Sequence, residues 1–256
     1  MGQRRTLRKL PQKDPPVGQY CPDVPYPDDI VFEDRPVDEL LFELLSFLAR
    51  PNKRQILTDV LQQRFTSLRH LLCASWDELM VPKQMTEMVA SGIVCFRSIH
   101  MAYCQCVLEK YPLDKTTKDC LAKLFMFRRC DSRDEIIDIA YFDKWKRLMP
   151  CGVKVINTGL SSEVTFNVKF LVRNAIREEA PYAVISHCHT NGNPEPSDAD
   201  RHATKFIANL LSFIGIELLD HIIVAGPSTF SFADSPDCSG DIIPADDIDE
   251  YSLFNW

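Results

Sequence analysis

The stretch AVISHCHTNGNPEPSDAD, residues 183–200, joins a short apolar run to two histidines and a polar loop. The apolar run predicts a buried strand, and in an extended backbone the rings of His187 and His189 emerge on the same side. A loop rich in Gly, Asn and Pro follows, and Ser197 with Asp200 three residues later is typical of a helix start. We therefore expect a strand, a turn and a helix in this order, with both histidines at the end of the strand.

His187, His189 and Asp200 form a candidate metal site. Two imidazoles can bind one cation at about 2.0 to 2.1 Å each, and the loop at 190–196 can return Asp200 to them. Two His and one carboxylate leave a fourth zinc position open for water, as in hydrolytic zinc sites. Two alternatives stay open, because Ser197 and Asp200 also make a capping box without metal, and an HxH pair also occurs among ordinary surface or core histidines.

The rest of the chain predicts a helical half followed by an α/β half. Over residues 35–130 apolar side chains recur three and four positions apart, which indicates amphipathic helices. From Asp134 the apolar period changes to two, and β-branched and aromatic residues become frequent, as in strands. The fold class is therefore α/β, with a helical N-terminal region and a boundary between Arg129 and Asp134.

Composition places the chain among ordinary globular proteins. It has 256 residues, of which 45% are hydrophobic and 25% charged. Neither a run of eighteen apolar residues nor a secretory signal is present, so we expect a soluble, cytoplasmic protein without membrane contact. The ten cysteines include no CxxC pair and are expected to be free thiols rather than a disulfide framework.

Charge is segregated along the sequence. Residues 206–256 contain nine acidic residues and no Lys or Arg, and residues 234–256 are interpreted as an acidic tail. Residues 1–34 form a basic, Pro-rich head, whose first basic side chains are Arg4, Arg5, Arg8 and Lys9. Such a head is typical of a disordered tail, and contact with nucleic acid is the alternative interpretation.

Residues 187–200 resemble the signature of the JAB/MPN metalloprotease-like family in its RadC-like branch. That signature is HxHPSG, three residues, PS, two residues and D, and this chain keeps every spacing. The similarity extends to LDHIIV at 219–224, to FSFA at 230–233 and, in the helical half, to residues 64–79. In all, the resemblance covers residues 35–233.

This resemblance implies a fold, a cofactor and an activity. A helical RadC-like domain would span residues 35–130, and a JAB/MPN-like mixed sheet flanked by helices would span residues 134–233. Zinc would be bound by the two histidines and Asp200, while Ser197 would stabilise a tetrahedral intermediate. The implied reaction is metal-assisted hydrolysis of an amide or isopeptide bond in a protein substrate.

Two departures from the family pattern leave other functions open. The family carries its catalytic glutamate on the strand before a glycine, but residues 152–157 contain no acid, and Glu163 is the nearest acid downstream. The family's DNA-binding hairpin corresponds to VPKQMTE at 81–87, which has lost both glycines. A catalytically impaired binding or scaffold module is therefore the second hypothesis, and a role in DNA repair or replication is the third.

Three side chains near the candidate ligands in the sequence are expected not to bind the metal. His221 follows an aspartate on an apolar strand and is expected to hydrogen-bond behind the metal ligands or within the core. His202 lies just past Asp200 and is expected to face solvent. Cys188 alternates with the two histidines and is expected to face the core.

Overall fold

The computed structural model describes residues 38–158 and 168–245, which belong to one compact unit, Pro36–Trp256. The basic head, Glu163 and residues 246–256 lie outside the described residues. Their predicted roles therefore stay predictions.

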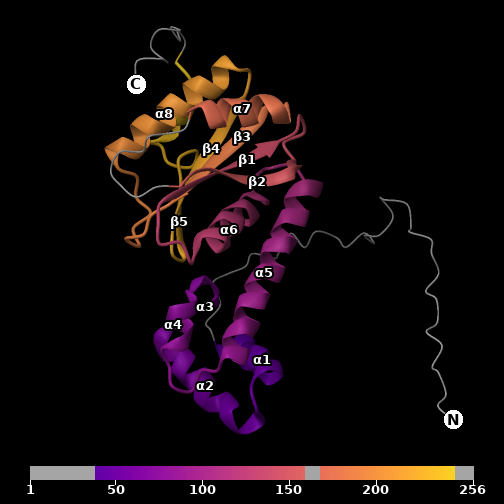
Figure 1. Cartoon of the computed structure of the whole chain (residues 1–256), viewed down its shortest axis with the longest axis vertical. Coiled ribbons are helices and arrows are strands. Elements are labelled where there is room, and N and C mark those ends of the chain that lie inside the picture. Colours follow the sequence, from indigo (N-terminus) through magenta and orange to yellow (C-terminus); the bar gives the residue numbers. More distant parts are fainter. Residues whose placement is uncertain (1–37, 159–167, 246–256) are drawn as a thin grey trace, which may run out of the picture. The chain divides into compact units, whose positions relative to one another are not determined.

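The described part of the N-terminal half consists of helices, as the apolar spacing predicts (Figure 1). They are α1 (Asp38–Leu48), α2 (Pro51–Arg64), α3 (Leu68–Cys73), α4 (Trp76–Met80), α5 (Glu87–Lys110) and α6 (Lys118–Arg129). Leucines of the first four helices share one buried cluster with Ile93 of α5. None of the described helices is both long enough and apolar enough to cross a membrane.

Short polar residues begin several of these helices. The hydroxyl of Ser75 accepts a hydrogen bond from the amide of Glu78, whose carboxylate accepts one from the amide of Ser75, so the predicted capping box is present. The hydroxyl of Thr86 accepts from the amide of Val89. The segment 81–87, which resembles the family's hairpin, thus provides the N-cap of the longest described helix.

The second half contains a five-stranded mixed sheet with the strand order β2-β1-β3-β4-β5. Its elements are β1 (Ile136–Phe142), β2 (Leu148–Thr158), α7 (Val168–Glu178), β3 (Tyr182–Cys188), α8 (Asp198–Phe213), β4 (Glu217–Ala225) and β5 (Ser228–Ser231). Strands β3 and β4 are parallel, and the other neighbours are antiparallel. This arrangement confirms the expected α/β fold.

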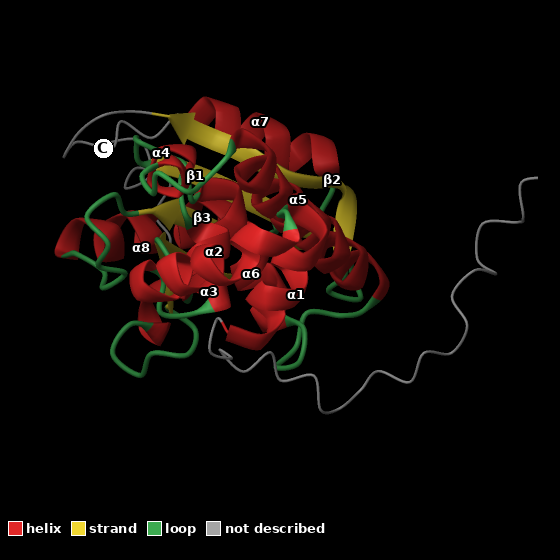
Figure 2. Ribbon diagram, turned by 90° about the horizontal axis from the view of Figure 1, so that it is seen from below, coloured by secondary structure: helices red, strands yellow, loops and turns green. Residues whose placement is uncertain are grey.

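Helices cover both faces of the sheet (Figures 1 and 2). On one face, Leu171 of α7 and Ile207 of α8 share a buried cluster with Ile185 of β3. On the other face, Phe125 of α6 packs in a cluster with Val184 of the same strand. Successive residues of β3 therefore enter opposite cores, which explains why this strand is apolar throughout its first half.

A buried ion pair links α6 to β1. The carboxylate of Asp138 is 1% exposed and accepts hydrogen bonds from the guanidinium groups of Arg128 and Arg129. A buried carboxylate is stable only with such partners, because ionised groups lose their hydration on burial. The last turn of the helical half is thereby fixed to the strand next to β3.

Residues after β5 fold back on α8. Cys238 is buried against Ile223 and Phe232, and a short 3-10 helix, η1 (Ser239–Ile242), follows. Arg201 Nε contacts Asp241 Oδ2 at 2.8 Å. The described part of the predicted acidic tail is therefore packed on the domain.

Replacing Asp138 with alanine is expected to lower the free energy of unfolding by about 3 to 5 kcal/mol, because two arginines lose the carboxylate that compensates their charge. Urea denaturation measures the change. Asp77→Ala is the matched control, since its ion pair with Arg133 is exposed and is expected to contribute less than about 1 kcal/mol. Equal losses in the two variants would contradict this role of Asp138.

Candidate metal centre

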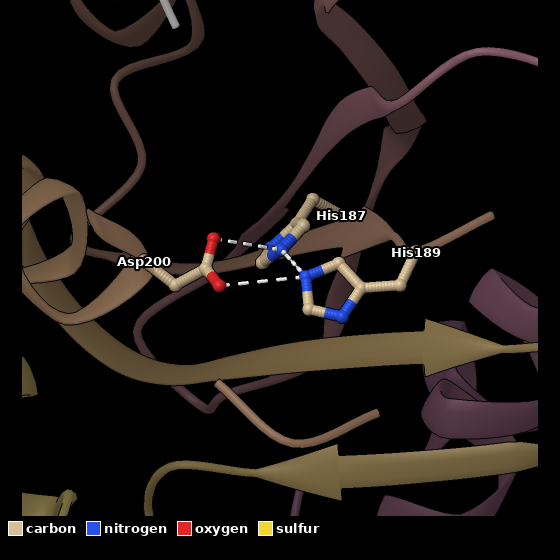
Figure 3. Close-up of side chains that lie close together, drawn as sticks. All are labelled: His187, His189 and Asp200. Atoms are coloured by element: carbon tan, nitrogen blue, oxygen red, sulfur yellow. Dashed lines mark hydrogen bonds and ion pairs between the residues drawn. The ribbon is translucent and has the colours of Figure 1, made fainter. Parts of the chain in front are cut away.

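His187, His189 and Asp200 meet where β3 ends and α8 begins (Figure 3). The Nε2 atoms of the two histidines are 2.8 Å apart. Asp200 Oδ1 lies 3.1 Å from Nε2 of His187, and Oδ2 lies 3.4 Å from Nε2 of His189. One ligand atom from each residue falls within 4.8 Å of the others, so all three could bind a single cation.

Strand geometry explains why both histidines are on one side. His187 lies within β3, and the amide of His189 donates to the carbonyl of Val224 at 2.8 Å, which continues the pairing with β4. Cys188 points to the opposite face, where its sulfur accepts a hydrogen bond from the amide of Ile136 at 3.3 Å. The predicted orientation of Cys188 toward the core is confirmed.

Asp200 belongs to a capping box and to the metal triad at the same time. The amide and the hydroxyl of Ser197 donate to Asp200 Oδ2 at 2.8 and 2.6 Å, and the amide of Asp200 donates to the hydroxyl of Ser197 at 3.2 Å. Asp200 Oδ1 remains directed at His187. The two interpretations of this motif are therefore compatible, because the helix cap positions the carboxylate that faces the histidines.

A chain of hydrogen bonds behind His187 fixes its tautomer. The hydroxyl of Thr204 donates to the carbonyl of Asp200 at 2.6 Å, because a carbonyl oxygen can only accept. The Thr204 oxygen therefore accepts from Nδ1 of His221 at 2.6 Å. Nε2 of His221 is then unprotonated and accepts from Nδ1 of His187 at 2.7 Å. Nδ1 of His187 therefore carries a proton, and Nε2 is the ring atom that faces His189 and Asp200.

His189 is oriented in the same way. Its Nδ1 lies 2.8 Å from the carbonyl oxygen of Asn193, so Nδ1 carries the proton and Nε2 carries a lone pair in the neutral ring. Both Nε2 lone pairs and the Asp200 carboxylate therefore face one small volume. The two lone pairs and the negative carboxylate repel one another unless a cation or a proton lies among them.

The shifts in pKa agree with this geometry. The hydrogen bond with Asp200 raises the pKa of His189, and the Asn193 carbonyl and nearby carboxylates act in the same direction against the effect of burial. Burial raises the pKa of Asp200, but the hydrogen bonds that it accepts when His187 or His189 is protonated, together with the hydrogen bond from Ser197, hold the pKa of this carboxyl well below its usual range. Burial lowers the pKa of His221, which keeps that ring neutral as the chain of hydrogen bonds requires.

His221 and His202 take the positions expected of them. His221 is buried and hydrogen-bonds to His187 rather than entering the triad, so its predicted position is confirmed. His202 is exposed, and its Nδ1 lies 2.7 Å from the carbonyl of Asp198. Thr204, the single threonine of α8, connects His221 to this helix and was not predicted, because no local pattern in the sequence marks it as a partner of His221.

Glu135 is an acid near the triad that the sequence did not reveal. Strands β1 and β3 are antiparallel, with Ile137 opposite His187. Glu135 directly precedes β1 and is two residues before Ile137 in the sequence. Glu135 is exposed, and its charge contributes to the raised pKa of His189. The position follows from the pairing of β1 with β3, which no local pattern specifies.

Strand β2, on which the family pattern places an acid, carries Lys154 in an ion pair. The ammonium group of Lys154 contacts the carboxylate of Glu178 on α7. The hydrogen bond from Lys154 lowers the pKa of Glu178 to about 2. This carboxylate is therefore held in an ion pair away from the triad.

A cavity of about 220 Å³ adjoins His189 and is walled by both halves of the chain. Helices α3 and α4 contribute part of the wall, and the loops after β3 and β4 contribute another part. Its lining includes His70, Cys73, Glu78, Arg129, Thr190 and Gly226. The helical half therefore borders a cavity that reaches His189.

Comparison with known proteins identifies relatives of the chain. Residues 115–237 match the family model of the RadC-like JAB domain. A UPF0758 protein of Neisseria gonorrhoeae (strain NCCP11945) is 27% identical over 194 residues, which cover 74% of this chain and 85% of the relative. A UPF0758 protein of Vibrio atlanticus (strain LGP32) is 26% identical over 197 residues, which cover 75% of this chain and 86% of the relative.

Substituting Thr204 with valine is expected to weaken zinc binding about 10- to 100-fold, because the chain of hydrogen bonds that fixes His187 loses its link to α8. Competition with a chromophoric chelator measures the affinity. His202→Ala, in an exposed position on the same helix, should leave the affinity unchanged. Wild-type affinity in Thr204→Val would refute the proposed tautomer.

The metal-free protein is expected to lose stability as the pH rises from about 6.5, the ordinary value for histidine, through the raised pKa of His189. Below that range a proton on His189 compensates the negative charge of Asp200. Above it the unprotonated Nε2 atom of His189 and the carboxylate of Asp200 repel each other. Urea denaturation across this range measures the effect. His189→Gln should lack this part of the pH dependence, and an unchanged slope in the variant would show that His189 does not cause it.

Proposed function

Residues 115–237 of this chain are a RadC-like JAB domain, and on this basis we propose that the protein is a zinc-dependent hydrolase of amide or isopeptide bonds. One observation carries the proposal, namely the convergence of two imidazole lone pairs and an ionised carboxylate on one point. Nitrogen and carboxylate oxygen are ligands that zinc accepts, and two His with one carboxylate leave a position for water.

In this proposal the zinc ligands are His187, His189 and Asp200, each through the atom that faces the others. Zinc, when bound, supplies a Lewis acid that lowers the pKa of a water molecule and polarises the scissile carbonyl. His221 and Thr204 hold His187 in the neutral tautomer that a metal ligand needs.

We assign the role of general base to Glu135, in place of the glutamate that β2 lacks. Its position directly before β1 and the effect of its charge on His189 support this assignment, since a carboxylate near the histidines could reach a water at the open position. Glu135 would take a proton from the attacking water and return it to the leaving amine. General-base assistance of this kind is worth about 10² to 10⁴ in rate.

Ser197 is proposed to stabilise the oxyanion of the tetrahedral intermediate. Its hydroxyl lies beside the triad and donates to Asp200 Oδ2 at 2.6 Å. Because a hydroxyl proton rotates freely, the same group can turn toward a developing negative charge.

The substrate is proposed to be a protein segment that enters through the cavity beside His189. The cavity adjoins one of the ligands and is bordered by His70 and Glu78 of the helical half. Helices α3 and α4 would then contact the part of the substrate next to the scissile bond.

A binding or scaffolding role without catalysis is the second candidate. Lys154 favours it, because the strand on which the family carries its glutamate here holds a lysine in an ion pair. In that case the metal triad would stabilise the fold, and Glu135 would have no catalytic role. A DNA role receives no further support from segment 81–87, which caps α5 and carries Glu87.

Metal analysis of the purified protein is expected to find about one zinc per chain, and the double variant His187→Ala, His189→Ala should lose it. Glu135→Gln should retain zinc but lower kcat for amide hydrolysis by about 10² to 10⁴. Asp134→Asn, which changes the exposed acid next to Glu135 in the sequence, is the matched control and should keep wild-type activity.

The outcomes separate the candidate functions. Zinc without turnover in the wild-type protein would favour the scaffold. Turnover that survives Glu135→Gln would support a hydrolase with a different base. Absence of zinc from the wild-type protein would contradict both the zinc-dependent hydrolase and the scaffold stabilised by a metal.

A further inference from the structure

The cavity beside His189 has a floor that both halves of the chain supply. Its buried lining residues are Cys73 and Ala74 at the end of α3, Met126 of α6, Cys188 of β3 and Val224 of β4. Each of these side chains is no more than 5% exposed, and none of them carries a charged group. The floor of the cavity is therefore apolar.

The rim of the cavity is polar, but its charged groups already have partners. Glu78 and Arg129 belong to this rim. The carboxylate of Glu78 accepts hydrogen bonds from the amide and the hydroxyl of Ser75 at 2.8 and 3.0 Å. The guanidinium group of Arg129 donates to both carboxylate oxygens of Asp138. The rim therefore offers little compensation for a charged group placed in the cavity.

The polar atoms of the lining are also satisfied. Cys130 Sγ accepts a hydrogen bond from the guanidinium group of Arg97 at 2.7 Å. Cys188 Sγ accepts one from the amide of Ile136 at 3.3 Å. Among the described residues that line the cavity, none has a buried side-chain nitrogen or oxygen without a hydrogen-bond partner. The lining therefore does not require a polar ligand.

We propose that this cavity is a specificity pocket, which takes one large apolar side chain (leucine, methionine or phenylalanine) of the protein substrate. The inference rests on the proposed hydrolase function and goes beyond it, because it names the side chain that the protein would select. The helical half would then take part in substrate recognition through Cys73 and Ala74.

The size of the cavity and the cost of burial both favour such a side chain. The volume is about 220 Å³, and an apolar cavity of about 150 Å³ is already large enough for benzene. Moving a leucine or phenylalanine side chain from water into an apolar site is worth about 10- to 150-fold in affinity. An ionised side chain would lose its hydration without gaining a partner, and glycine would leave the cavity unfilled.

His189 connects the pocket to the metal triad. It lines the cavity, and its Nε2 atom lies 3.4 Å from Asp200 Oδ2. Cys188, the preceding residue, faces the opposite side of β3 and belongs to the floor. The triad and the pocket thus lie on the two sides of the end of β3. A peptide that crosses this strand end would place one side chain in the pocket while a neighbouring amide faces the triad.

The test uses acetylated amino acid amides as probes and does not require turnover. The full-length protein, with carbon-13 in its methionine methyl groups, is titrated with N-acetyl-leucinamide, N-acetyl-glycinamide or the amide of N-acetylglutamate. The NMR signal of Met126 reports the pocket, because this buried side chain belongs to its floor. We expect the leucine probe to shift this signal with an affinity about 10- to 150-fold higher than that of either other probe.

Two variants close the pocket in different ways. Ala74→Leu fills the floor, and Thr190→Trp covers the exposed rim, so one variant remains informative if the other impairs folding. Each folded variant should bind the leucine probe at least about 10-fold more weakly than the wild-type protein. Ala102→Leu makes the same substitution as the first variant at an exposed position of α5 and should keep wild-type affinity.

The outcomes separate this inference from the proposed function. Leucine-selective binding that the closing variants weaken would support the pocket, and absence of turnover in the same protein would contradict only the hydrolase. If the protein cleaves a peptide library, the products should show a large apolar residue beside the scissile bond, and Ala74→Leu should shift this preference toward glycine. Equal affinity for the three probes, an unchanged Met126 signal, leucine binding that survives in a folded closing variant, or cleavage without such a preference would overturn the inference.

Discussion

The chain of hydrogen bonds from the carbonyl of Asp200 through Thr204 and His221 to His187 is the constraint on which the proposed metal centre depends. A carbonyl can only accept, so the direction of every bond in the chain is set from its first member. His187, the last residue of the chain, faces Asp200 with its Nε2 atom. The carboxylate of Asp200 is in turn held by the capping box with Ser197. The start of α8 therefore fixes both the carboxylate of Asp200 and the tautomer of His187.

The fold supplies the contacts that this chain of hydrogen bonds requires. Parallel pairing of β3 with β4 brings His221 next to His187 across the sheet, and α8, which connects these strands, brings Thr204 over both. The face of β3 opposite the triad is closed by α6, which Asp138 anchors. The triad is thus built on strands and a helix start rather than on flexible loops, which suits a site whose ligands must keep their geometry.

Patterns of sequence spacing predicted those parts of the site whose residues lie close together along the chain. The HxH pair after an apolar strand and the cap formed by Ser197 and Asp200 were both recognisable from spacing, and the period change near Asp134 separated the helical from the α/β half. Features that depend on pairing between distant segments were not predictable. The influence of Glu135 on His189 and the contribution of the helical half to the cavity wall both require the tertiary fold.

X-ray absorption spectroscopy at the zinc edge of the zinc-loaded protein tests the central claim most directly, because it reports which atoms surround the metal. The account predicts two imidazole nitrogens and oxygen at about 2.0 to 2.2 Å, with no sulfur, since Cys188 points into the opposite core. A sulfur neighbour at about 2.3 Å, or a spectrum of zinc surrounded by water alone, would contradict a centre formed by His187, His189 and Asp200.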